Sequence, residues 1–144
     1  MNQLLAASRI TVGYTLLYSG AMLHQVMTKN LLIAQQQQQQ GKTFDRYNST
    51  EMRNADRLLA NFMEWLPIFM GPLWALAASD QLTETHVRIA WSYVGTRGLY
   101  AALVLAYGVA GNGRNTRLWA STFPGYGCLL YLLYQSVSLV LVLL

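Results

Sequence analysis

The sequence alternates between long apolar stretches and shorter polar segments. Four stretches are mainly apolar, at about residues 4–27, 57–78, 86–110 and 118–144. Each is as long as the roughly 20 residues that a helix needs to cross about 30 Å of hydrocarbon. The pattern therefore predicts an all-α fold: an integral membrane bundle of four helices, forming a single four-span domain over residues 1–144.

The longest polar segment, residues 28–56, separates the first two apolar stretches. It contains six consecutive glutamines, Gln35 to Gln40, a composition typical of a disordered or weakly helical connector. A second polar connection, Gly111 to Arg117, precedes the last stretch. Lys and Arg concentrate in these two connections and their flanks, which lie on one side of a four-span bundle. The positive-inside rule therefore predicts that both connections face the cytosol, or its organellar equivalent, and that both termini lie on the far side.

The composition supports a membrane protein. The 144 residues are 53% hydrophobic and 11% charged, whereas a soluble domain carries about 25% charged residues. The net charge of +4 could suggest a nucleic-acid partner, but the sequence has no stripe of Lys and Arg that alternates with aromatic residues, which argues against nucleic acid. We expect an endoplasmic reticulum or organellar membrane, with membrane lipid as a partner. The single cysteine, Cys128, excludes an internal disulfide and is expected to be buried and unreactive.

Charged side chains inside a span cost about 2.5–3.5 kcal/mol each and need a partner or a purpose. Arg57, Asn61 and Glu64 follow the spacing i, i+4, i+7, which places them on one helical face over about 10 Å. A cation, an amide and an anion in sequence suit a zwitterionic ligand. They equally suit a structural network in which an arginine of a neighbouring helix neutralises Glu64 and Asn61 bridges the two.

The third stretch carries Arg97 and Tyr100, one helical turn apart. Arg97 lies too deep in its span to reach the interface, so we expect it to pair with Glu64. Tyr100 and Tyr107 could offer hydroxyls to a pocket, or could serve packing and interfacial anchoring. The two histidines, His24 and His86, have no ligand-like neighbours in the sequence, so no metal site is expected.

These residues carry a family resemblance. Residues 57–69, Arg-Leu-Leu-Ala-Asn-Phe-Met-Glu-Trp-Leu-Pro-Ile-Phe, resemble the RxxxNxxExxPxF signature of the membrane-associated proteins in eicosanoid and glutathione metabolism (MAPEG). That family includes microsomal glutathione transferases as well as a non-catalytic lipoxygenase-activating protein. Its second element, an arginine followed three residues later by tyrosine or histidine, falls on Arg97 and Tyr100.

The resemblance implies a homotrimer that binds glutathione between adjacent protomers near the cytosolic face. Arg57 and Asn61 would hold carboxylate or backbone groups of glutathione, and Glu64 its amino group. Arg97 and Tyr100 would complete the site. The implied chemistry is attack of the glutathione thiolate on a lipophilic small molecule arriving from the bilayer, or reduction of a lipid hydroperoxide.

The sequence also departs from the family pattern. Val104 stands where family enzymes usually have a further tyrosine, and the activating arginine that they carry soon afterwards has Arg114 as its nearest candidate, with Arg117 close by. Two functions therefore stay open. One is a glutathione-dependent membrane transferase or peroxidase with Arg114 as the catalytic residue. The other is a non-catalytic accessory or scaffold subunit of a larger membrane complex.

Overall fold

The computed structural model describes residues 2–38, 45, 46, 48–109 and 116–143. Within these residues the chain is all-helical and contains no strand, and the prediction of four helices is confirmed. The four long helices are α1 (Gln3–Gln38), α2 (Thr50–Ala78), α3 (Glu84–Tyr107) and α4 (Trp119–Leu143). A short 3-10 helix, η1 (Thr116–Leu118), directly precedes α4.

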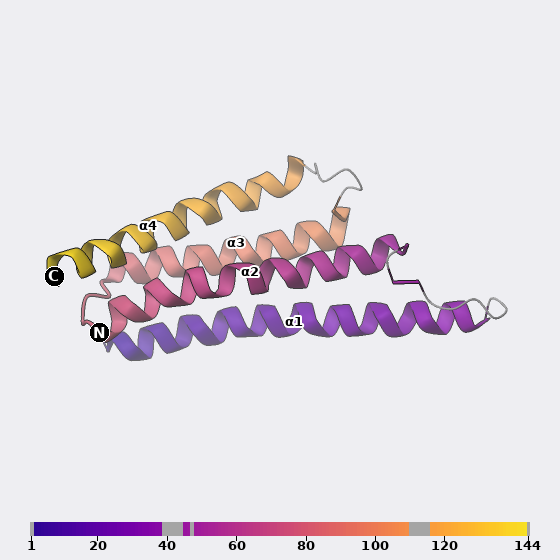
Figure 1. The fold of residues 1–144 in the computed structure, drawn as a ribbon, viewed down its shortest axis with the longest axis horizontal. Helices are drawn as coiled ribbons and strands as arrows, with labels where there is room; N and C mark the ends of the chain where they lie inside the picture. The colour runs from indigo at the N-terminus through magenta and orange to yellow at the C-terminus, as the bar shows by residue number, and fades with distance from the viewer. Residues whose placement is uncertain (1, 39–44, 47, 110–115, 144) are drawn as a thin grey trace.

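The helices lie side by side along one long axis (Figure 1). The pair α2 and α3 occupies the middle, with α1 packed against both on one flank and α4 packed against both on the other. In the described part of the chain, α1 and α4 do not contact each other. The start of α1 and the end of α4 lie at the same end of the bundle. That this end lies on the side of the membrane away from the cytosol stays a prediction.

Two helices extend further into the polar segment 28–56 than the hydrophobic pattern predicted. The first, α1, continues to Gln38, so the described part of the glutamine run is helical rather than disordered; Gln39 and Gln40 lie outside the described residues. At the other end of the segment, α2 begins at Thr50, because the hydroxyl of Ser49 accepts a hydrogen bond from the Met52 backbone N–H at 3.1 Å. Such an N-cap satisfies a donor that the first turn leaves free. Helix formation here depends on capping and side-chain packing, which a hydropathy pattern does not register.

The end of α3 is fixed by a contact with the start of α2. Gly108 has a φ of 66°, a left-handed conformation that glycine adopts without strain. The next backbone N–H, that of Val109, donates to the Asn54 side-chain oxygen at 2.9 Å. A Cβ on Gly108 would lie 2.8 Å from the Asn54 side-chain nitrogen. Asn54 and Gly108 thus join the two helices at the end of the bundle where the charged residues gather.

The core draws on all four long helices, and its part between α1, α2 and α3 is rich in aromatic rings. Tyr14, Phe62, Phe69 and Tyr93 are all completely buried, and the rings of Phe69 and Tyr93 are 4.3 Å apart. The Tyr14 hydroxyl donates to the Phe62 carbonyl at 2.7 Å, so a polar group at the centre of the bundle is satisfied. This cluster fixes α2 and α3, which carry the candidate site, relative to each other and to α1.

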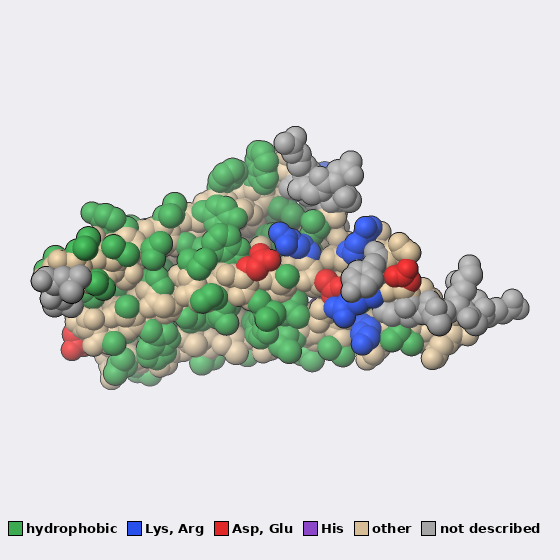
Figure 2. Space-filling view, viewed as in Figure 1, with side chains coloured by type: hydrophobic (Ala, Val, Ile, Leu, Met, Phe, Trp, Pro, Cys, Tyr) green, Lys and Arg blue, Asp and Glu red, His purple; other side chains and the backbone are tan. Residues whose placement is uncertain are grey.

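The surface carries many exposed large apolar side chains, whereas charged side chains gather toward one end (Figure 2). Leu16, Leu23, Tyr134 and Leu141 are each more than 60% exposed. Each of the four long helices rises at least about 36 Å, enough to cross a bilayer by length. Among the described helices, one, spanning Thr116–Val142, also meets the apolarity expected of a membrane span. The spans predicted for the other three helices stay predictions.

Candidate functional site

Arg57 and Glu64 meet on the outer face of α2. The Arg57 Nη1 and Glu64 Oε1 atoms are 3.5 Å apart, and the two side chains are 56% and 52% exposed. The seven-residue spacing brings them together, because it corresponds to two helical turns. The charged pair is therefore weakly held and half accessible, surrounded by exposed apolar residues such as Met63 and Ile68.

Asn61 lies between Arg57 and Glu64 in the sequence of α2, and its side chain contacts α3. Its side-chain oxygen accepts a hydrogen bond from Arg97 Nη1 at 2.7 Å, and Arg97 is only 2% exposed. The expected Glu64–Arg97 ion pair is therefore wrong: Glu64 pairs with Arg57, and a neutral amide holds the buried guanidinium. The reason is geometric, since Glu64 lies on the outward stripe of α2 while Arg97 lies inside the bundle.

Aromatic rings complete the surroundings of Arg97. Its guanidinium carbon lies 4.8 Å from the Tyr93 ring centroid and 5.8 Å from that of Trp65, within the range of cation–π attraction. A Cβ on Gly125 of α4 would lie only 3.0 Å from Arg97 Nη2, so this glycine leaves room for the guanidinium. The Nε and Nη2 atoms of Arg97 have no hydrogen-bond partner among the described residues.

Sequence reasoning missed Trp65, Tyr93 and Gly125 as neighbours of the buried arginine. Tyr93 precedes Arg97 by one helical turn, and this spacing could have identified it, because residues four apart lie on the same helical face. Nothing in the sequence could have identified Gly125, whose role depends on how α4 packs against α3.

Tyr100 belongs to the same group of residues, whereas Tyr107 does not. Tyr100 is 6% exposed and interacts electrostatically with Arg57, Arg97 and Glu64. Tyr107 lies at the exposed end of α3, with the Arg117 guanidinium carbon 4.3 Å from its ring centroid. The structure thus brings together all five residues predicted to bind a ligand.

The predicted catalytic residue, Arg114, lies outside the described residues. Cys128 is partly buried and packs against the core. Among the described residues, no group of three or more His, Cys, Asp or Glu side chains could hold a metal ion.

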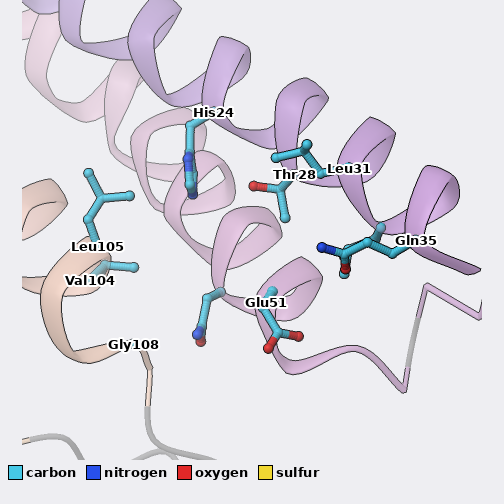
Figure 3. Close-up of a pocket in the computed structure, with 10 residues that line it drawn as sticks. His24, Thr28, Leu31, Gln35, Glu51, Val104, Leu105 and Gly108 are labelled. Carbon is cyan, nitrogen blue, oxygen red and sulfur yellow. The ribbon is translucent and has the colours of Figure 1, made fainter.

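Two cavities flank the site. An apolar cavity of 230 Å³ lies between α2 and α4, beside the Trp65 and Tyr126 rings, and leucines and an isoleucine complete its lining. A larger cavity of 620 Å³ lies between α1, the start of α2 and the end of α3 (Figure 3). Val104 and Asn54 line this second cavity, and each lies one helical turn from a residue of the candidate site, Tyr100 and Arg57 respectively.

The comparisons with known proteins identify a family. Neither a curated protein nor a solved structure matches the chain. The sequence does match the MAPEG family over residues 4–138, a range that includes all of α2 and α3, most of α1 and α4, and every described residue of the candidate site. The chain therefore belongs to the MAPEG family, whose membrane-associated members take part in eicosanoid and glutathione metabolism.

Proposed function

We propose that this chain binds glutathione at the face formed by Arg57, Asn61 and Glu64, and uses the bound thiol to attack or reduce a lipophilic small molecule. The observation that carries the proposal is the half-exposed Arg57–Glu64 pair. Glutathione has two carboxylates and one ammonium group, so a cation and an anion on one face match its charges. At 3.5 Å the pair is loose, and a zwitterion can exchange each half for a shorter charge-assisted contact.

The position of the pair supports a ligand or a second protein copy above it. Exposed ion pairs in water contribute only about 0–1 kcal/mol, whereas charges facing hydrocarbon are costly. Met63 and Ile68 on the same helix are also exposed, so the pair sits within an apolar surface. A homotrimer in which an adjacent protomer closes over this face would shield both the pair and the ligand.

Arg97 and Tyr100 support the face from inside the bundle. Because Arg97 is buried and donates to Asn61, we propose that it holds the Asn61 side chain in position and adds positive potential beneath the ligand. The Tyr100 hydroxyl would approach the ligand from α3.

Glutathione supplies a nucleophilic thiol, and the chain must raise its ionised fraction. A thiol with a pKa near 8.5 is only about 3% ionised at pH 7. A cation that lowers this pKa by about two units stabilises the thiolate by about 2.7 kcal/mol and raises its fraction about 25-fold. Arg114 is the residue that we propose for this role.

The apolar cavity between α2 and α4 supports a lipophilic second substrate. Its lining includes Trp65, which directly follows Glu64 in the chain, and no charged residue among those described. An aliphatic or aromatic group entering from a bilayer could occupy it while its reactive atom reaches the thiol. We propose an endoplasmic reticulum or organellar membrane, with both polar connections toward the cytosol.

Glutathione binding by the purified protein, measured by calorimetry, tests the proposal. Glu64→Gln removes one charged contact worth about 1.5–3 kcal/mol, so we expect affinity to fall about tenfold or more. Glu84→Gln is the matched control, because Glu84 is also exposed and paired with an arginine but lies at the opposite end of α3 from the polar connections. No binding by the wild-type protein, or equal losses in the two variants, would refute the proposal.

Ultraviolet difference absorbance then separates catalysis from binding, because it reports the glutathione thiolate directly. We expect Arg114→Ala to retain glutathione and to lose the thiolate signal. A full thiolate signal in that variant would exclude Arg114 from the activating role.

One observation favours the second candidate, a non-catalytic scaffold or accessory subunit. Arg97 is closed in by protein on every side, with Asn61, Trp65 and Tyr93 around it, so this part of the motif serves packing as it stands. A purely structural role predicts that glutathione leaves thermal stability unchanged and that the protein copurifies with a larger assembly in mild detergent.

A further inference from the structure

We propose that the 620 Å³ cavity between α1, α2 and α3 binds a lipophilic primary amine, a molecule with one ammonium group and an apolar chain. The proposal concerns a site other than the Arg57–Glu64 face and does not depend on glutathione. Its volume lies within the 300–1,000 Å³ range of small-molecule sites. Figure 3 shows Thr28 and Gln35 reaching in from α1, with Glu51 on α2 opposite them.

The electrostatics of the cavity favour a cation. Among the described residues that line the cavity, Glu51 is the one acidic side chain, His24 is the one histidine, and none is a lysine or arginine. The Glu51 backbone N–H and the Ser49 hydroxyl, whose oxygen lies 3.0 Å from Oε2, hold the pKa of this carboxyl below its ordinary value. Glu51 is therefore anionic at neutral pH.

The end of α3 adds to this negative potential. Val104, Leu105 and Gly108 line the cavity and form the last turn and C-cap of α3. The last carbonyls of a helix lack intrahelical partners and carry about half a negative charge. The last turn of α3 contains no basic residue.

Two arginines, one on α2 and one on η1, make contacts elsewhere. Arg117 lies over the ring of Tyr107, and Arg53 donates to the Thr50 hydroxyl at 3.3 Å. Neither arginine lines the cavity. A carboxylate and a helix C-terminus thus face the same space without a lysine or arginine among the described residues that line it.

The remaining lining selects among cations. A divalent metal ion prefers several oxygen ligands, often including more than one carboxylate, and this cavity offers a single one. Quaternary ammonium groups are bound by cages of several aromatic rings, best those of Trp and Tyr, and the described lining residues offer a single ring, the imidazole of His24. A primary ammonium has three donors, which Glu51 and the side-chain oxygens of Thr28 and Gln35 can accept. Leu31, Leu32 and Leu105 provide an apolar wall for the attached chain.

Photoaffinity labelling of the full chain in phosphatidylcholine nanodiscs tests the proposal. The probe is dodecylamine carrying a diazirine, and the adducts are mapped by mass spectrometry. We expect adducts to concentrate near Leu31 and Leu105, and expect competition by dodecylamine but not by dodecanol. Adducts spread evenly over the exposed apolar residues of all four helices would overturn the proposal, as would equal competition by dodecanol.

Two variants and a control sharpen the test. Glu51→Gln should lower labelling at these positions about tenfold, the loss of one charge-assisted contact, and Leu105→Trp should lower it by filling the cavity. Glu84→Gln, an exposed acid in the first turn of α3 at its other end, should leave it unchanged. Because Glu51 and Leu105 are both exposed, both variants should fold. Labelling of Glu51→Gln at the wild-type level would refute the site.

Discussion

Replacing Asn61 with leucine should destabilise the protein, because Asn61 provides the only hydrogen bond to the Arg97 guanidinium among the described residues. Arg97 is 2% exposed, so water cannot substitute for the lost amide oxygen in the structure as it stands. The guanidinium would keep only the rings of Tyr93 and Trp65.

The cost can be bounded from these contacts. A hydrogen bond to a charged group contributes about 1.5–3 kcal/mol, and removing one partner of a buried charged pair costs about 3–5 kcal/mol. Asn61 is neutral and the two cation–π contacts persist, so the lower range applies and we expect about 2–3 kcal/mol. For a chain of this size that corresponds to a fall in Tm of roughly 4–12 °C.

Thermal unfolding in detergent, followed by tryptophan fluorescence, measures this change. A double-mutant cycle with Arg97→Met isolates the contact, because a buried charge and its partner can often be replaced together by apolar residues at little cost. The double variant should lose less stability than the sum of the losses in the two single variants, by at least about 1.5 kcal/mol in the free energy of unfolding. A change below about 0.5 kcal/mol in Asn61→Leu alone would refute the reasoning.

Three further predictions follow from local geometry and charge. Gly125→Ala should lower the free energy of unfolding by about 1–3 kcal/mol, because the added Cβ would lie 3.0 Å from the buried Arg97 guanidinium. Gly127→Ala in the same helix should be neutral or stabilising in the same unfolding assay, because a Cβ there would meet no heavy atom within 4 Å. Gly108→Ala should lower the free energy of unfolding by about 1–2 kcal/mol, since a φ of 66° is strained for alanine. A variant as stable as wild type would contradict the geometry described for the end of α3. The hydrogen bonds from Arg46 hold the pKa of Asp56 below its ordinary value. The Arg46–Asp56 pair therefore contributes to the free energy of unfolding, by at most about 1 kcal/mol at this exposure. This contribution is fully present above the unfolded-state pKa of about 3.9 and is lost as the pH falls through the folded-state pKa. Asp56→Asn should remove this dependence from unfolding measured against pH.

The helical architecture could be predicted from the sequence because hydrophobic runs and polar breaks are local features. The start of α2 at Thr50 could not be read from hydropathy, since it depends on the Ser49 cap within a polar segment. The helical continuation of α1 to Gln38 was likewise hidden, because glutamine is compatible with either state.

The role of the candidate site residues stays a prediction, and their pairing could be predicted only in part. Helical spacing alone places Arg57 and Glu64 together, and this needed no knowledge of other helices. The partner of Arg97 depends on how α2 and α3 are rotated about their axes, which a sequence does not specify. The cavity beside Glu51 was not anticipated, because it arises from the meeting of three helix ends.

The burial of Arg97 also has a consequence for assembly in a membrane. Chains are made from the N-terminus, so α2, with Asn61 and Trp65, precedes α3 into the bilayer on the proposed topology, and Tyr93 enters with Arg97 on the same helix. The guanidinium therefore meets its contacts as soon as α3 docks. The strongly apolar α4, which carries Gly125, enters last. It packs against the Arg97 guanidinium after the guanidinium has made its contacts with α2 and with Tyr93.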